Sequence, residues 1–256
     1  MDKLLFIKHM LRAKLGALLV GSGVVFGIWY LGFLAMDSHV LPNPVVVFRH
    51  LPTIMNETMW LHLRHSFLRV LMGLVVSMSI GLAMGILAAQ NKWLAKILNP
   101  FIYFTYPIPR VALLPVVMLL FGMGDTSKVI MISMIVVYPI IIVVRDSVAD
   151  IPKDIDNALT CYGASRVDVF FSITLPWAFS AILSTLRISL GTAIAILFFT
   201  ETYGTRFGMG FFILDAWMRI SYVQMYGGIV LLSLSGYVLF MVIDLLEDYL
   251  LRWKKG

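Results

Sequence analysis

Long apolar stretches separated by short polar ones run along most of the chain. A helix needs about 20 apolar residues to cross the hydrocarbon core of a bilayer. Six stretches approach that length, near residues 15–36, 67–90, 98–122, 127–144, 176–200 and 226–243. Backbone groups in lipid have to be hydrogen-bonded within their own segment, and these stretches lack the strict alternation of barrel strands. The pattern therefore predicts an all-α polytopic membrane protein with about six transmembrane helices.

The third stretch, 98–122, is the least regular of the six. Its segment "YPIPRVALLP" contains Pro107, Pro109 and Pro115. A proline inside a helix removes a backbone donor and clashes with the preceding turn, so we expect a broken helix there. Such breaks are tolerated at membrane depth where the backbone faces protein or a water-filled path.

Composition supports a membrane protein and excludes several other classes. Hydrophobic residues make up 60% of the chain and charged residues only 13%, which leaves too little polar surface for a soluble domain. The net charge of +6 does not indicate a nucleic-acid partner, because the basic residues cluster at the ends of apolar stretches. The single cysteine, Cys161, excludes an internal disulfide and a cysteine-based zinc site.

The distribution of basic residues predicts the orientation of the chain. Six spans place both termini on one side. With the N-terminus inside, the inner segments hold twelve lysines and arginines and the outer segments hold six, which favours both termini in the cytoplasm. The six outer residues are Arg49, Arg64, Arg69, Lys128, Arg206 and Arg219. We expect a cytoplasmic amphipathic segment at 1–14, one transmembrane domain at 15–250 and a cytoplasmic tail at 251–256. The first apolar stretch is too long for a cleaved signal peptide, so we expect it to be retained.

The segment 150–175 connects the fourth and fifth expected spans and is cytoplasmic in this topology. Its first part has apolar or small side chains at helical spacing, at Ile155, Ala158, Leu159 and Tyr162. Gly163 follows where a left-handed helix cap would stand. Ser165 with Asp168 resembles a capping box, and a second apolar stripe runs from there to Pro176, which suits the first turn of the next span. We therefore expect two short helices joined by a glycine bend.

Two functions fit such a pair of helices. The pair could lie on the lipid headgroups as an interfacial element, or it could insert into a groove on a soluble partner. The segment contains Asp150, Asp154, Asp156 and Asp168, which anionic lipids would repel, and this favours docking to a protein. The residues by themselves leave both functions open.

The spacing within "NALTCYGASRVDVFFSITLP" resembles the EAA loop of ABC-importer permeases, whose pattern is E-A-A-x3-G-x9-I-x-L-P. The residues that match are Ala158, Gly163, Ile173, Leu175 and Pro176. Asn157 replaces the glutamate and Leu159 replaces the second alanine. In that family the loop forms coupling helices that fit a cleft on a cytoplasmic ATPase. The resemblance implies the same role here, with Ala164 and Ser165 beside the glycine.

Two further segments resemble the nitrate/sulfonate/taurine branch of these permeases. They are "PIPRVALLPVVMLLFGMGDTSK" and "LRISLGTAIAILFFTETYGTRFGMGFFILDA", the second with Glu201 at the glutamate of that branch. The resemblance implies the membrane subunit of an ATP-driven importer that works as a homodimer in a bacterial inner membrane. It also implies two cytoplasmic ABC ATPase subunits, which carry ATP and Mg, and an extracytoplasmic solute-binding protein. We expect no catalytic residue, no metal site and no cofactor on this chain itself.

Four residues are candidates for the translocation path or its gate. Arg187 lies near the middle of its span, where a charge is costly and should face a carboxylate, helix-end carbonyls or water. Arg110, in the broken third span, has the same alternatives, and Glu201 is either a counter-charge or a gate contact. Tyr106 either stacks on the solute or lies at the membrane interface. A cationic lining would favour anionic solutes such as nitrate, sulfonates, taurine or bicarbonate.

Other polar groups receive structural explanations. His62 and His65 share a helix face but have no third ligand nearby, so a solvated helix is favoured over a metal site. Asp244 and Glu247, near the end of the last span, are expected to be ordinary interfacial residues. An ion-coupled secondary transporter should show inverted repeats and more membrane carboxylates, and a membrane-embedded enzyme should show a polar cluster at one depth. Neither pattern is evident in the sequence.

Overall fold

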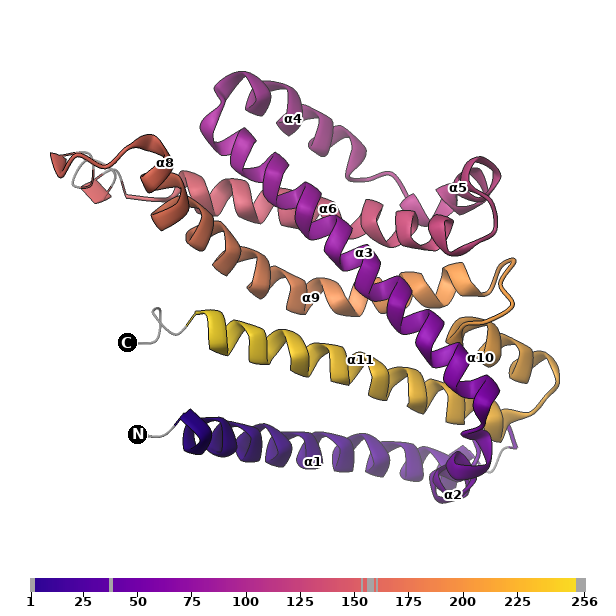
Figure 1. The fold of residues 1–256 in the computed structure, drawn as a ribbon. Helices are drawn as coiled ribbons and strands as arrows, with labels where there is room; N and C mark the ends of the chain where they lie inside the picture. Colours follow the sequence, from indigo (N-terminus) through magenta and orange to yellow (C-terminus); the bar gives the residue numbers. More distant parts are fainter. Residues whose placement is uncertain (1–2, 37–38, 153, 156–158, 160, 252–256) are drawn as a thin grey trace. The chain divides into compact units, whose positions relative to one another are not determined.

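Helices joined by short turns and loops make up most of the part that the computed structural model describes, which comprises residues 3–36, 39–152, 154–155, 159 and 161–251 (Figure 1). No strand occurs in these ranges, which confirms the predicted all-α class. The chain divides into two compact units. One comprises Met1–Met59 with Ile213–Val230, and the other comprises Trp60–Phe212 with Leu231–Gly256.

The smaller unit contains α1 (Lys3–Met36), α2 (Pro44–Ile54) and parts of α10 (Met209–Met218) and α11 (Tyr222–Leu250). The α2 helix begins where the Asn43 side chain accepts a hydrogen bond from the Val45 N–H, and its first-turn proline suits a helix start. Trp29 of α1 donates to the Pro42 carbonyl (3.1 Å) and stacks on Tyr226, with 5.2 Å between the ring centroids.

The larger unit holds most of the remaining helices. They are α3 (Glu57–Gln90), α4 (Lys92–Thr105), the 3₁₀ turn η1 (Arg110–Leu113), α5 (Leu114–Phe121), α6 (Asp125–Ala149), α8 (Arg166–Val169), the π-helical turn η2 (Phe170–Thr174) and α9 (Leu175–Glu201). The expected spans 127–144, 176–200 and 226–243 fall within α6, α9 and α11. The helix that contains the second expected span, 67–90, is longer than predicted, because α3 begins at Glu57.

Four helices in the described part of the chain are long and apolar enough to cross a membrane, namely Glu57–Gln90, Asp125–Ala149, Arg166–Glu201 and Tyr222–Leu250. The pair Lys92–Thr105 and Arg110–Phe121 would make a fifth span, bent by 88° at its break. This bend confirms the broken third helix that the prolines predict. In α1 the shorter segment Val20–Met36 is apolar.

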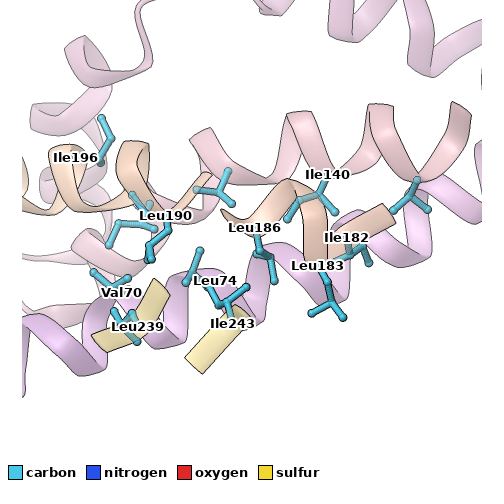
Figure 2. Close-up of a cluster of buried hydrophobic side chains, with 14 of the residues drawn as sticks. Val70, Leu74, Ile140, Ile182, Leu183, Leu186, Leu190, Ile196, Leu239 and Ile243 are labelled. Carbon is cyan, nitrogen blue, oxygen red and sulfur yellow. The ribbon is translucent and has the colours of Figure 1, made fainter. Parts of the chain in front are cut away.

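The hydrophobic core of the larger unit forms around the packed helices α6 and α9 (Figure 2). Ile140 of α6 lies among Ile182, Leu186 and Leu190 of α9, all of them at most 3% exposed. Val70 and Leu74 of α3, with Leu239 and Ile243 of α11, extend the same cluster. The core therefore ties together helices from distant parts of the sequence.

A ridge of small residues on α3 lies directly against α6. Its members are spaced four apart, at Gly73, Ser77, Gly81 and Gly85. A Cβ atom added to Gly73 would lie 2.5 Å from Ile132 Cγ2, and one added to Gly85 would lie 2.6 Å from Val144. The Ser133 hydroxyl donates to the Gly73 carbonyl (3.2 Å) across the same contact. Small residues let two membrane helices approach closely, so this ridge fixes α3 on α6.

Candidate functional site

The first candidate site is the loop between α6 and α9, and its glycine bend is well defined. Gly163 has φ +84°, the left-handed conformation that a helix cap requires. The Ala164 N–H donates to the Leu159 carbonyl (3.1 Å), which is the bond of a Schellman motif. Both features confirm the predicted cap. Asn157 and Ala158 lie outside the described residues.

The predicted capping box that follows the bend is also confirmed. Ser165 Oγ accepts the Asp168 N–H (3.3 Å), and the Asp168 carboxylate accepts the Ser165 N–H (2.8 Å). These reciprocal bonds satisfy two backbone donors that a helix start otherwise leaves unpaired.

The second loop helix differs from its prediction because it does not end before the next span. The chain is continuously helical from Arg166 to Glu201, with the π turn η2 between α8 and α9. Ile173, Leu175 and Pro176 are half-buried and lie inside this helix, not at a boundary between two helices. Movement of the loop would therefore pass directly into α9.

Large apolar side chains of this loop point away from the rest of the chain. Tyr162 is 91% exposed, Val167 63% and Phe171 61%. The single cysteine, Cys161, is a free and exposed thiol beside them. A cluster of exposed apolar side chains marks a surface that contacts either a protein or a lipid.

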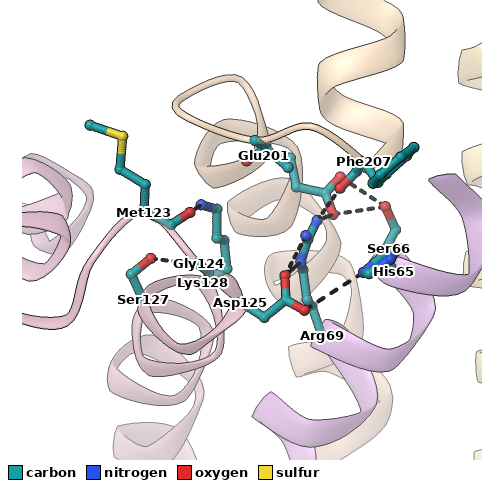
Figure 3. Close-up of polar contacts among 12 residues, drawn as sticks. His65, Ser66, Arg69, Met123, Gly124, Asp125, Ser127, Lys128, Glu201 and Phe207 are labelled. Atoms are coloured by element: carbon teal, nitrogen blue, oxygen red, sulfur yellow. Dashed lines mark hydrogen bonds and ion pairs between the residues drawn. The ribbon is translucent and has the colours of Figure 1, made fainter. Parts of the chain in front are cut away.

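The second candidate site is a group of polar and charged side chains, most of them buried, which we call the Arg69 cluster (Figure 3). It consists of His62, Ser66 and Arg69 of α3, Asp125 and Lys128 of α6, and Glu201 of α9. Arg69 is 3% exposed, while Lys128 and Glu201 are fully buried. Burying charges is costly unless each is paired and hydrogen-bonded, so the partners of each group matter.

Arg69 contacts three different elements with one guanidinium group. Its Nη1 donates to Glu201 Oε1 (2.6 Å) and to the Phe207 carbonyl (2.8 Å). Its Nε and Nη2 donate to Asp125 Oδ1, at 2.9 and 2.5 Å. The planar fork of arginine suits such multiple contacts with oxygen atoms.

Three side chains of the cluster cap the start of α10. The Gly208 N–H donates to His62 Nδ1 (2.9 Å), the Met209 N–H to Ser66 Oγ (2.8 Å) and the Gly210 N–H to Glu201 Oε2 (2.9 Å). The Ser66 hydroxyl itself donates to the Glu201 carboxylate, at 2.8 Å from each oxygen. The first backbone donors of a helix have no partner within the helix, and here α3 and α9 supply the acceptors.

Lys128 completes the charge balance of the cluster. Its ammonium group donates to the Met123 carbonyl in the turn after α5. Arg69 and Lys128 carry two positive formal charges, and Asp125 and Glu201 carry two negative ones. The cluster is therefore formally neutral, which reduces the cost of burying Arg69, Lys128 and Glu201, whereas the Asp125 side chain is 48% exposed.

The cluster bears on two sequence expectations. The Glu201 carboxylate pairs with the Arg69 guanidinium (2.6 Å), which is the contact that a counter-charge makes. His62 is not on a solvated helix as expected, because it is 5% exposed and lies among the rings of Phe207, Phe211 and Phe212. Within the described residues no group of three or more potential metal ligands occurs.

Sequence reasoning missed Ser66 and Arg69 as members of a site, although a signal was present. His62, Ser66 and Arg69 are spaced i, i+4 and i+7, so three polar side chains share one face of a mostly apolar helix.

Arg187 lies at a different place, between α9 and α11. Its Nη2 is 2.5 Å from Asp244 Oδ1 and 2.5 Å from Glu247 Oε2. The side chains of Asp244 and Glu247 are only 13% and 20% exposed. The expectation that they are ordinary interfacial residues is therefore wrong, because they form an ion triplet with Arg187.

Arg110 lies beside the break between α4 and η1, against aromatic rings. Its guanidinium carbon is 3.9 Å from the centre of the Tyr138 ring and 5.4 Å from that of Tyr106. Such cation–π contacts stabilise a cation without a carboxylate. Arg110, Arg187 and Glu201 thus occupy three separate places.

A cavity of about 450 Å³ lies between α3 and α6. Its lining is mainly apolar, with Met72, Val76, Ile80 and Met134 among the lining side chains and Asp125 also present. The candidate path residues Arg110, Arg187, Glu201 and Tyr106 do not line it. Asp125 belongs to the Arg69 cluster and also lines this cavity.

Membrane-length helices that bury ionic groups between them define a polytopic membrane protein. The family model described as the binding-protein-dependent transport system inner membrane component matches residues 81–256, so the chain belongs to this family. The family description names a membrane component of a transporter and not a catalytic one. The chain is accordingly an inner-membrane protein.

Similar curated proteins belong to the taurine and sulfonate branch. The taurine transport system permease protein TauC of Escherichia coli is 29% identical over 88% of this chain and 84% of its own length. The aliphatic sulfonates transport permease protein SsuC of E. coli, a putative assignment, is 27% identical over 96% of this chain and 94% of its own length. The formylaminopyrimidine transport permease protein ThiX of Halalkalibacterium halodurans is 24% identical over 86% of this chain and 88% of its own length.

A solved structure supports the fold. A chain of the MetNI methionine ABC transporter, in an inward-facing conformation, superposes with a TM-score of 0.64 at 17% identity. The match covers 77% of this chain and 99% of the MetNI chain.

Proposed function

We propose that this chain is the transmembrane permease subunit of an ABC importer and forms the path for a small anionic solute of the sulfonate or taurine type. Family membership and the names of TauC and SsuC support this substrate class. The proposal includes six spans with both termini in the cytoplasm and a second copy of the permease. Two cytoplasmic ATPase subunits carry ATP and Mg, and an extracytoplasmic binding protein delivers the solute.

The proposed mechanism uses the loop 150–175 as a lever. ATP binding closes the ATPase pair, and the loop transmits that movement to the membrane helices. The spans then switch from inward-facing to outward-facing, and the binding protein releases its solute into the path. The permease does no covalent chemistry in this scheme, because hydrolysis takes place on the ATPase subunits.

The construction of the loop is the observation that carries the proposal. Its bend and its second helix are fixed by their own caps, at Gly163 and Ser165, and the second helix continues into α9. Tyr162, Val167 and Phe171 expose apolar surface that a cleft on a soluble partner would cover. A rigid element with an uncovered apolar face, joined directly to a span, suits transmission of force better than attachment to lipid.

Copurification tests the proposed function. We expect the chain to copurify with an ABC ATPase encoded beside it, and the reconstituted complex with its binding protein to import taurine into liposomes only when ATP is present. Ion-driven uptake by the isolated chain would support the alternative of a secondary transporter and contradict the proposal.

Replacement of Gly163 by proline tests the lever. Proline fixes φ near −65°, which is incompatible with the φ of +84° at this position. We expect the Gly163→Pro protein to insert normally but to lose ATPase binding and uptake. Gly124→Ala is the matched control, because Gly124 lies in a turn with nothing within 4 Å of an added Cβ and has φ −73°. Normal ATPase association and uptake in Gly163→Pro would refute the lever.

A further inference from the structure

We propose that Arg69 is a positioning residue for transport, which ties the start of α10 to α3, α6 and α9 so that these helix ends move as one body when the path changes access. This inference rests on the proposed transport function. It adds a specific role for a buried side chain that lies outside the loop 150–175.

The first argument concerns what Arg69 connects. One guanidinium group bonds to Glu201 of α9, to Asp125 of α6 and to the Phe207 carbonyl just before α10. Every nitrogen of the guanidinium group is used. A lysine would keep the charge at this position but has a single nitrogen, so it could not hold all three partners in this geometry.

The second argument concerns the start of α10, which is held by side chains from outside the helix. His62, Ser66 and Glu201 accept three successive backbone N–H groups of the segment 208–210. Any shift of the segment 208–210 relative to His62, Ser66 and Glu201 would leave buried donors without acceptors, which is costly. Arg69 holds the Glu201 carboxylate in place, and this carboxylate is the acceptor for the third of these groups, the Gly210 N–H.

The third argument concerns the segment that leads into α10, which is closely packed at two of its glycines. A Cβ added to Gly208 would lie 2.5 Å from the Glu201 carboxyl carbon and 2.8 Å from Arg69 Nη1. A Cβ added to Gly204 would lie 2.8 Å from the Met123 sulfur. Segment 202–208 is thus packed against the ion pair at one point and against the turn before α6 at another.

The fourth argument concerns why charges are used. A buried ion pair stabilises a fold no more than an apolar contact of the same size, and often less, but its hydrogen bonds are satisfied in only one arrangement of its partners. An apolar contact would allow sliding between helix ends. The hydrogen bonds of the Arg69 cluster are instead either all made or broken, with no intermediate sliding. Helix ends held in this way are expected to move together when the protein changes between two states.

Coupled transport measures this role directly. Arg69→Lys keeps the charge, and Arg64→Lys is the matched control because Arg64 lies on the same helix but is exposed. In the reconstituted complex we expect Arg69→Lys to lower ATP-driven taurine uptake about tenfold while ATP hydrolysis stays within about twofold of the unmodified protein. A purely structural role would lower both rates together, in proportion to the amount of folded complex, and would overturn the inference.

A second measurement does not depend on the solute. In a Cys161→Ser background, a Thr205→Cys substitution places one reporter thiol in the segment that Arg69 holds. We expect Arg69→Lys to raise the rate of maleimide labelling of this thiol in the full complex about fivefold, and Arg64→Lys to leave it unchanged. Unchanged labelling in Arg69→Lys would overturn the role of Arg69. Failure of the unmodified chain to bind an ATPase would instead overturn the proposed function.

Discussion

At the scale of single residues, Ser66 shows how densely the Arg69 cluster is connected. Its hydroxyl donates to the Glu201 carboxylate and accepts the N–H of Met209, so one small side chain joins α3 to both α9 and α10. Ser66 is 2% exposed, and water therefore cannot replace either bond without local opening.

We expect Ser66→Ala to lower the free energy of unfolding by about 1–3 kcal/mol, because the Met209 N–H loses its acceptor while it remains buried. Titration of the purified protein with a denaturing detergent measures the change. Ser79→Ala is the control, since Ser79 lies on the same helix, is exposed, and donates only to the carbonyl one turn earlier, that of Val75. Equal stability of the two variants would contradict the capping role.

The charged residues of the cluster show where prediction from sequence stops. Glu201 is predictable as a counter-charge, because an isolated carboxylate near a span end needs a partner. Its partner Arg69 is not predictable, since the two lie 132 positions apart in sequence. Periodicity identifies side chains that share a helix face but not the groups opposite them. Arg69 and Lys128 were therefore counted among the outer charges, although both are buried.

At the scale of helices, the small-residue ridge of α3 determines how closely α3 approaches α6. We expect Gly81→Ala to destabilise the protein by about 1–3 kcal/mol, because the added Cβ would overlap Ile140, which is fully buried and cannot yield. Gly191→Ala in α9 is the control, since nothing lies within 4 Å of a Cβ at that position. Detergent unfolding midpoints compare the two variants. Matching midpoints would show that α3 and α6 are not in close contact.

The helices of the loop 150–175 show which features of the fold are determined by neighbouring residues and which are not. The glycine cap and the capping box were predictable because neighbouring residues determine them, at Gly163 and at Ser165 with Asp168. The continuous helix from Arg166 to Glu201 was not predictable, because the π turn that joins α8 to α9 has no sequence signal of comparable strength. Pro176 is compatible with both arrangements, since it falls in the first turn of α9.

The ion triplet of Arg187 with Asp244 and Glu247 links α9 to α11 and allows a test of the cationic path. We expect Arg187→Gln to weaken taurine uptake. Its effect on stability should be about 1 kcal/mol or less, because the side chain is 41% exposed and solvent screens the pair. A triple variant that combines Arg187→Gln with Asp244→Asn and Glu247→Gln also removes the two carboxylates that lose Arg187 as their partner. Uptake that returns in this triple variant would assign Arg187 a structural role, whereas uptake that stays low at normal abundance would support a cationic path.

At the scale of the whole molecule, the orientation of the chain is a prediction from the count of its basic residues, twelve inside against six outside. Two of the six outer residues, Arg69 and Lys128, are buried and hydrogen-bonded in the fold. Basic residues influence orientation while the chain inserts, before its helices pack, so this burial does not change the count on which the prediction rests.

The single cysteine provides a direct test of that orientation. Cys161 is exposed in the loop 150–175, so an impermeant maleimide should label it in inside-out vesicles and not in intact spheroplasts. In a Cys161→Ser background, a Tyr203→Cys substitution places the thiol in the exposed connection after α9 and should give the opposite result. Gel-shift of the labelled protein measures both. Labelling of Cys161 from outside would place the loop on the wrong face of the membrane for a cytoplasmic ATPase, and the proposed coupling would then be wrong along with the topology.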